Sequence, residues 1–179
     1  MSSILDYEDR NTCILFGDGA GAVLLEPSSK YGMLDCELGI DGSGSQFLNM
    51  PAGGSLNRTT NDTVSKKMHF VKQNGAVVFK HAVKGMYDIT RKVMIRNKID
   101  NQNLKLFIAH QANKRIIDAT ASKIGLNDDQ ILINIDKYAN TTAASIPIAL
   151  SDAYESNLLN KGDNLIMTAF GAGFTWGSC

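Results

Sequence analysis

The sequence of 179 residues is poor in cysteine, proline and tryptophan, with three, three and one of each, and it contains no long apolar run. The cysteines (Cys13, Cys36 and Cys179) are odd in number and form no CxxC motif, which argues against a disulfide framework or a zinc site. The apolar runs fall far short of the roughly 20 residues that a membrane-spanning helix needs. Polar and acidic residues follow Met1, where a signal peptide would carry basic charge and then an apolar core. These absences predict a soluble cytoplasmic protein with no membrane contact and no metal site.

An excess of charge of one sign is also missing. The 18 basic and 18 acidic residues give a formal net charge of zero, so nothing indicates a partner among nucleic acids or membrane surfaces. The length suffices for one well-buried domain. We interpret Cys13 and Cys36 as small buried hydrophobic residues and Cys179, at the end of the sequence, as mobile.

The stretch from Leu104 to Gly125 organises the rest of the sequence, because it changes from strand to helix period at a histidine. Residues 104–109 are mostly apolar, as in a strand buried on both faces. From Ala112 the apolar residues recur at three- and four-residue spacing, and Gly125 stands where a left-handed residue ends a helix. His110 therefore lies at the carboxyl end of a strand, where open α/β sheets bind ligands.

Two further joints are predicted downstream. Residues 130–135 have the composition of a strand that exits through Asn140, and Thr141 or Thr142 is the expected cap of a helix running to about residue 157. Residues 164–170 are the last expected strand, followed by a sharp glycine turn at 171–173. Because parallel strands with right-handed crossovers end at one edge, we expect His110, Asn140 and the glycine turn to converge there.

The upstream half is less regular. Residues 9–25 contain two apolar runs around a glycine-rich turn, interpreted as two strands so close that only Gly and Ala fit between them; a phosphate cradle is disfavoured because no helix follows the turn. Residues 26–70 are loop-rich, with a strand expected at 32–39, and form either a binding loop or a solvated insertion. Residues 75–89 have helical spacing, and basic residues from Arg91 to Lys98, with Lys114 and Arg115, are candidates for a basic patch near the site.

Three ordered motifs resemble the β-ketoacyl-acyl-carrier-protein synthase III family of type II fatty acid synthesis: His110 to Asn113, Asn140 to Ser145, and Phe170 to Gly177. Residues 9–25 resemble the same family. The resemblance implies the α/β thiolase-like fold, in which two similar halves, each a mixed five-stranded sheet flanked by helices, pack into five layers. It implies that residues 1–28 hold the last strands of the N-terminal half and residues 29–179 the C-terminal half, with a loop-rich excursion at about 40–70.

The resemblance implies a decarboxylative Claisen condensation, in which an acyl primer such as acetyl-CoA is transferred to a cysteine and then attacked by the carbanion of decarboxylated malonyl-acyl carrier protein. His110 and Asn140 match the catalytic pair that donates hydrogen bonds to the malonyl thioester oxygen. The backbone at Ala172, or at its neighbour Gly171, matches the oxyanion site. The positions that match substrate-binding residues of the acyl pocket and pantetheine tunnel are Gly75, Phe79, Ala112, Asn113, Arg115 and Phe170.

The resemblance also implies acyl carrier protein and acyl-CoA as partners, a homodimeric parent, and no cofactor other than the coenzyme A thioester substrate. The family's nucleophilic cysteine lies upstream of the segment that matches Asp9, so we expect a fragment that holds the His and Asn half of the site and is inactive alone. One alternative is another thiolase-fold acyltransferase of the polyketide-starter, quinolone or hydroxymethylglutaryl-CoA type. Another is a non-catalytic half that pairs with a separate N-terminal polypeptide. At residue level the alternatives are a structural His110 and an Asn140 that only caps a helix.

Overall fold

A mixed sheet forms the centre of the computed structural model, which describes residues 1–179. Its strand order is β1-β6-β5-β4, with β4 and β5 parallel and the other two pairings antiparallel. The strands are β1 (Glu37–Ile40), β4 (Leu104–Ala109), β5 (Asn164–Gly171) and β6 (Thr175–Ser178). The arrangement is the mixed, helix-flanked sheet expected from the sequence.

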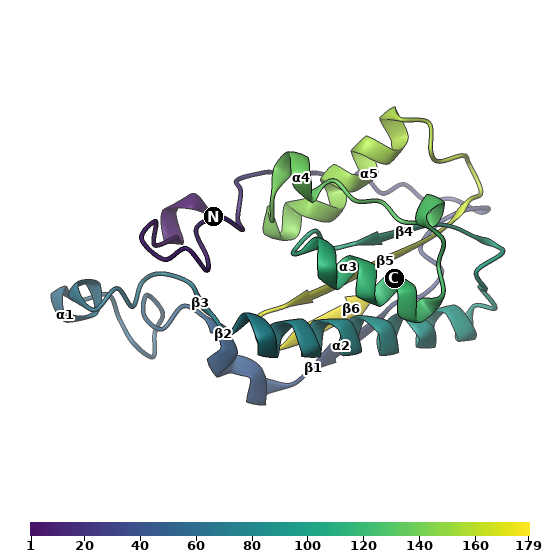
Figure 1. The fold of residues 1–179 in the computed structure, drawn as a ribbon. Coiled ribbons are helices and arrows are strands. Elements are labelled where there is room, and N and C mark those ends of the chain that lie inside the picture. Colours follow the sequence, from purple (N-terminus) through teal and green to yellow (C-terminus); the bar gives the residue numbers. More distant parts are fainter.

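Helices lie on both faces of this sheet (Figure 1), although the face opposite α2 stays open at β1, where Leu38 is 81% exposed. The long helices are α2 (Gly75–Arg96), α3 (Lys114–Ile124) and α5 (Ser145–Glu155). Side chains of α2 and α3 pack with Phe107 and Ile166 on one face, whereas Ala149 and Ala153 of α5 pack with Ile108 on the other. Since β4 is covered on both sides, its last four residues are all buried, as its continuous apolar sequence predicts.

Local sequence sets the ends of α2 and α3. The side chain of Asn74 accepts the N–H of Val77 at 3.2 Å and begins α2, which continues past the predicted residue 89 to Arg96. Asn113 accepts the N–H of Arg115 at 2.9 Å and begins α3, and Gly125 ends it with φ of 87°. The predicted strand, helix and left-handed glycine around His110 are therefore confirmed.

The strand predicted at residues 130–135 is wrong. The structure has a 3₁₀ turn at Asp128–Gln130, one parallel bridge between Ile131 and Phe107, and the short helix α4 (Ile135–Tyr138). The side chain of Gln130 is buried and donates to the carbonyls of residues 101 and 104 at 2.7 Å, so it turns the chain where a strand ladder would begin. The sheet consequently has four full strands and one bridged segment rather than five strands.

The two strands predicted within residues 9–25 are also absent. Only Phe16 makes a bridge, and it pairs with Asn140. Leu24 and Leu25 are 84% and 87% exposed, because no neighbouring strand lies beside them to complete a ladder. The strand expected at 32–39 is the shorter β1, which starts at Glu37.

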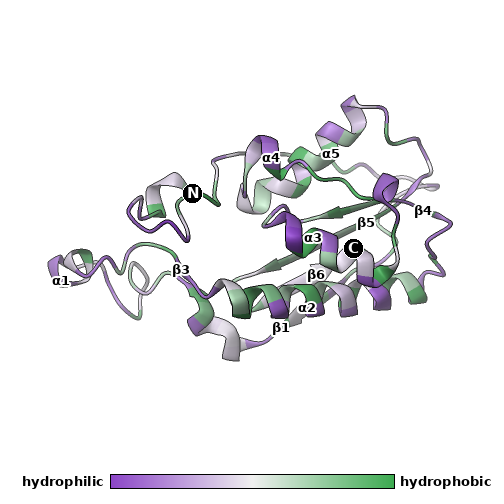
Figure 2. Ribbon diagram, viewed as in Figure 1, coloured by the Kyte–Doolittle hydropathy of each residue, from purple (hydrophilic) through white to green (hydrophobic).

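Residues 41–73 form an irregular extension (Figure 1), and most of these residues are exposed or half-buried. Its elements are a 3₁₀ turn at Gly42–Phe47, β2 (Leu48–Asn49), α1 (Asn61–Ser65) and β3 (Lys72–Gln73), with β2 and β3 paired antiparallel. Two more 3₁₀ turns lie at Ser2–Ile4 and Thr142–Ala144. Hydrophilic residues dominate around α1, and hydrophobic residues follow the strands of the main sheet (Figure 2). None of the helices combines the length and apolar character needed to cross a membrane.

Candidate active site

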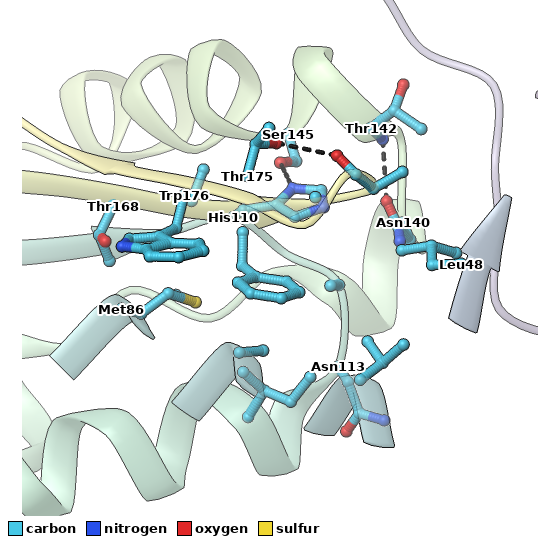
Figure 3. Close-up of a pocket in the computed structure, with 18 of the residues that line it drawn as sticks. Leu48, Met86, His110, Asn113, Asn140, Thr142, Ser145, Thr168, Thr175 and Trp176 are labelled. Atoms are coloured by element: carbon cyan, nitrogen blue, oxygen red, sulfur yellow. Dashed lines mark hydrogen bonds between the residues drawn. The ribbon is translucent and has the colours of Figure 1, made fainter. Parts of the chain in front are cut away.

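One cavity of about 1230 Å³ brings together all the residues proposed from the sequence for the site. It lies at the carboxyl ends of β4 and β5, and Figure 3 shows His110 and Asn140 among its lining side chains. The ten residues proposed from the sequence that line it are Gly75, Phe79, His110, Ala112, Asn113, Arg115, Asn140, Phe170, Gly171 and Ala172. Their shared cavity is a structural observation, and their chemical roles stay predictions.

His110 is held at the end of β4 by backbone and side-chain contacts. Its backbone N–H donates to the carbonyl of Thr168 on β5 at 2.8 Å. Its Nδ1 lies 2.6 Å from Oγ of Ser145, the first residue of α5 (Figure 3). The backbone N–H of Gln111 donates to the same Oγ at 3.3 Å. The imidazole is therefore oriented from both the sheet and the helix.

These contacts indicate which nitrogen of His110 carries the proton. Ser145 Oγ accepts from Gln111, and His110 Nδ1 is the one acceptor within reach of its own proton. We therefore infer that Nδ1 accepts and that Nε2 carries the hydrogen. Burial lowers the pKa of His110 to about 4, so the ring is neutral near pH 7. The result is a neutral imidazole with Nε2–H as its free donor.

The side chain of Asn140 is oriented by the backbone that follows it. Its Oδ1 accepts the N–H of Thr142 at 2.9 Å, whereas Nδ2 makes no hydrogen bond within the protein (Figure 3). Thr141 occupies the N-cap position of the following 3₁₀ turn but its side chain makes no capping bond, so the side-chain oxygen at this turn comes from Asn140. Because capping occupies only the oxygen, the amide N–H groups remain available as donors in the cavity.

The backbone of Asn140 is fixed by the glycine-rich segment. Its N–H donates to the carbonyl of Leu15 at 2.9 Å, and its carbonyl accepts from Gly17 at 3.0 Å. A Cβ on Gly17 would lie 2.5 Å from the carbonyl oxygen of Tyr138, so only glycine permits this approach. The close packing predicted for this segment is therefore real, but its partner is the Asn140 loop and not a second strand.

Backbone strain flanks the same residue. Ala139 has φ of 59° and ψ of −164°, a region that is almost confined to glycine, and Thr142 has φ of 55° although it is β-branched. Such conformations persist only where the surroundings hold them in place. The two backbone hydrogen bonds of Asn140, with the carbonyl of Leu15 and the N–H of Gly17, hold this strained segment in place.

The glycine turn joins β5 to β6 as a hairpin, with Gly171 paired to Thr175. The hydroxyl of Thr175 donates to the carbonyl of Ala172 at 3.0 Å. The N–H of Ala172 makes no hydrogen bond within the protein, and this residue is exposed on the cavity wall. The turn thus offers a free backbone donor in the cavity that also holds His110 and Asn140.

The basic residues proposed for a patch near the site do not gather at the cavity. Arg96 pairs with Asp35 and Glu37 on and beside β1, and Lys114 pairs with Asp118 within α3. These ion pairs occupy part of the positive charge that the sequence offers for a patch. Arg115 alone among the basic candidates lines the cavity, with its guanidinium carbon 5.6 Å from the ring centre of Phe79.

Known protein families match this sequence over most of its length. Residues 94–179 match the family model for the C terminal part of 3-oxoacyl-(acyl-carrier-protein) synthase III, and residues 1–42 match the model for 3-oxoacyl-(acyl-carrier-protein) synthase III. The β-ketoacyl-(acyl-carrier-protein) synthase III of Koribacter versatilis is 51% identical over 99% of this chain and 54% of its own length. The chain belongs to the β-ketoacyl-acyl-carrier-protein synthase III family.

Solved structures of the family share the fold. The 3-oxoacyl-(acyl-carrier-protein) synthase III of Aquifex aeolicus superposes with a TM-score of 0.87 at 38% identity, over 99% of this chain and 53% of that one. The priming β-ketosynthase of the R1128 polyketide pathway superposes with a TM-score of 0.87 at 30% identity, over 99% and 53% of the two chains. The thiolase-like α/β fold is therefore confirmed. The chain spans about half the length of the curated relatives it matches.

Two residues that position the site in this synthase III chain were not assigned from the sequence. Ser145 was part of the Asn140 to Ser145 motif, but a serine at a helix start is ordinarily interpreted as a cap. Gln111 is 1% exposed; its amide donates to the carbonyls of Ala109 and Leu132, and its oxygen accepts from Asn134. Such a buried amide ties β4 to the segment before α4. Its only sequence signal is a polar residue directly after a buried strand.

Proposed function

We propose that this chain supplies the decarboxylation half of a condensing site. The observation that carries the proposal is that two neutral donors, Nε2–H of His110 and Nδ2–H of Asn140, line one cavity while their other polar atoms are occupied by Ser145 and Thr142. A neutral imidazole and an amide remain donors throughout the physiological pH range. Donors fixed in this way stabilise an oxygen on which negative charge develops.

The reaction proposed begins with a malonyl thioester in the cavity. When the terminal C–C bond breaks and carbon dioxide leaves, the bonding electrons form an enolate, and its charge is greatest on the thioester oxygen. Hydrogen bonds from His110 and Asn140 to that oxygen lower the barrier, by about 3 kcal/mol for each donor on the scale of other oxyanion sites. The carbanion then attacks an acyl group carried by a cysteine thioester, and the thiolate leaves.

The resemblance to the family supports the remaining assignments. The nucleophilic cysteine is proposed to lie in an N-terminal half that precedes this sequence, with residues 1–28 as the last part of that half and 29–179 as the C-terminal half. The free N–H of Ala172, next to Gly171, is proposed to hold the tetrahedral oxyanion. The cavity walls around Phe79 and Phe170 suit an acyl chain, and Asn113 and Arg115 suit pantetheine and its phosphate.

Acyl carrier protein, acyl-CoA and a homodimeric assembly in the cytoplasm complete the proposal for the whole protein. The names of the relatives include acyl carrier protein, and this supports a carrier-bound malonyl substrate. Chains of this family that lack the cysteine half are expected to transfer no acyl group. The purified 179-residue chain should therefore show no labelling from radioactive acetyl-CoA.

The decisive experiment uses a full-length enzyme that contains this sequence, with His110→Ala. We expect acylation of the enzyme by acetyl-CoA to continue while malonyl decarboxylation falls about 100- to 1000-fold, since one oxyanion donor is lost. His81→Ala is the matched control, because His81 lies on α2 and bonds only to the carbonyl of Val77. Undiminished decarboxylation in the His110 variant would remove this residue from its proposed role.

The second candidate function is priming of polyketide synthesis, and the similarity to the R1128 priming β-ketosynthase favours it. The same donors would serve, since the candidates differ in the primer and the acceptor and not in the decarboxylation. An acceptor assay on the full-length enzyme separates them. Preference for malonyl-acyl carrier protein of fatty acid synthesis over a polyketide carrier supports the first candidate, and the reverse preference supports the second.

A further inference from the structure

Cys36 and Cys179, far apart in the sequence, are opposite each other across two strands. The pairing of β1 with β6 runs from Ile40 opposite Thr175 to Glu37 opposite Ser178. One further step in the same antiparallel register places Cys36 opposite Cys179. Both thiols are free. The structure thus brings together two of the three cysteines, although neither is near the other in sequence.

The hydrogen bonds determine the type of this pair. Asp41 and Phe174, in the same register, exchange both backbone hydrogen bonds, at 2.8 and 2.7 Å. Because hydrogen-bonded and non-hydrogen-bonded pairs alternate along an antiparallel ladder, Cys36 and Cys179 form a non-hydrogen-bonded pair. A second observation agrees: the N–H and carbonyl of Cys179 both bond to Met167 on β5, away from β1.

Such a pair has the spacing that a disulfide needs. Opposed Cα atoms in non-hydrogen-bonded pairs are about 4.5 Å apart. Disulfides span Cα separations of roughly 4.4–6.8 Å. Backbone movement is therefore not required for the two sulfur atoms to meet, provided that their side chains lie on the same face.

The neighbouring pairs show that they do. A Cβ on Gly177 would lie 2.8 Å from Cδ2 of Leu38, so Leu38 lies over its partner on one face. Gly39 instead meets the ring of Trp176 on the α2 face. Side chains alternate between the two faces along a strand, so Cys36 lies on the same face as Leu38, two residues later. Leu38 is 81% exposed, and Cys36 is also exposed. The cysteine pair therefore lies on the face of β1 and β6 opposite α2, in the wall of the cavity described above, and small reagents enter through that cavity.

We propose that Cys36 and Cys179 form a redox-active dithiol that a low-molecular-weight disulfide oxidises to an intrachain bond joining β1 to the end of β6. The Cys36 thiolate attacks one sulfur of the small disulfide, a mixed disulfide forms, and one small thiolate leaves. The Cys179 thiolate then attacks the sulfur of Cys36 and expels the second small thiolate. Two protein thiols are oxidised, and one small disulfide is reduced to two thiols.

The order of attack follows from exposure. Cys36 is exposed, whereas burial and the neighbouring Cys36 raise the pKa of the Cys179 thiol. The more accessible Cys36 therefore reacts first, and Cys179 resolves the mixed disulfide. In a compartment buffered by reduced glutathione the pair stays open and closes under oxidising conditions. Both cysteines also line the cavity that holds His110 and Asn140, so closing the bond changes a wall of the proposed condensing site without using either donor.

The test treats the reduced 179-residue chain, at low concentration, with oxidised glutathione. Free thiols are then counted in denaturant, and peptides are mapped by mass spectrometry without reduction. We expect the count to fall from three to one, in a monomer that contains a peptide linked through Cys36 and Cys179. Cys13→Ser is the matched control, and it should form the same bond and retain no free thiol.

Cys36→Ser and Cys179→Ser test the pair itself. Serine is nearly isosteric with cysteine, and circular dichroism checks that each variant keeps its fold. Neither variant should form an intrachain bond, and Cys179→Ser should accumulate the glutathione adduct at Cys36. The proposal is contradicted if the treated chain keeps three free thiols, forms a bond through Cys13, or forms only intermolecular dimers.

Discussion

The two proposed donors share one cavity but are held by very different parts of the molecule. His110 follows β4, where Phe107, Ile108 and Ala109 are fully buried between two helical layers. Asn140 is pinned by Leu15 and Gly17, in a segment whose later residues Val23 to Leu25 are exposed. One donor therefore depends on core packing and the other on two backbone hydrogen bonds from a thinly packed segment. Changes in the core and in the segment should consequently affect stability and the site in different proportions.

The largest expected effect comes from the core beneath His110. Phe107→Ala removes a fully buried ring and should lower the free energy of unfolding by about 3–5 kcal/mol. Leu24→Ala, at a position 84% exposed, should change it by less than about 0.5 kcal/mol. Denaturant titration followed by circular dichroism measures both. Equal losses in the two variants would mean that the exposed segment is packed as firmly as the sheet.

The next effect is a pH dependence that belongs to His110. Burial lowers its pKa to about 4 in the folded chain, against 6.5 for an ordinary histidine, so between these values the unfolded chain binds more protons. The contribution of neutral His110 to the free energy of unfolding is therefore fully present above about pH 6.5. It is lost as the pH falls to 4, by up to about 3 kcal/mol. His110→Gln should lack this component, so subtracting its unfolding profile from that of the unchanged chain isolates it. A difference that does not vary with pH would contradict the assignment.

A smaller effect is expected in the segment that holds Asn140. Gly17→Ala places a Cβ 2.5 Å from the carbonyl oxygen of Tyr138, a backbone atom that cannot move alone. The free energy of unfolding should fall by about 1–3 kcal/mol, and the amide resonances of residues 139–142 should shift. Gly42→Ala is the control, since nothing lies within 4 Å of its Cβ position. Unchanged resonances in the Gly17 variant would show that Asn140 is held without this segment.

The same contrast explains which features were predictable from sequence. The strand and helix around His110 have strong apolar periods, and local caps at Asn113 and Gly125 agree with them, so their positions were predicted closely. Residues 9–25 have equally apolar runs, but a strand also needs a partner, and the sequence does not say which chain segment lies beside it. The glycines of this segment predicted a close approach to another part of the backbone, but not that this part is the loop before Asn140.

The site was predictable as a set of residues and less so as a set of bonds. Strand ends and motifs indicated His110, Asn140 and the glycine turn, and all of them line one cavity. Ser145 was not assigned, because its contact with Nδ1 joins residues 35 positions apart and depends on how α5 lies against β4. The turn made by Gln130 was missed for a similar reason, since its amide bonds to carbonyls more than 25 residues upstream.

The smallest effect on stability should accompany a large effect on chemistry. Asn140→Ala removes one capping bond and should cost about 1 kcal/mol, as should Asn74→Ala, which removes the corresponding bond at the start of α2. In a full-length enzyme, however, only the Asn140 variant loses a donor facing the cavity, so malonyl decarboxylation should fall about 100- to 1000-fold in that variant alone. If the Asn140 and Asn74 variants lose similar stability and decarboxylate at equal rates, Asn140 has only a structural role. A difference confined to decarboxylation separates the role of the amide nitrogen, which has no partner within the protein, from that of the oxygen, which bonds to the following turn.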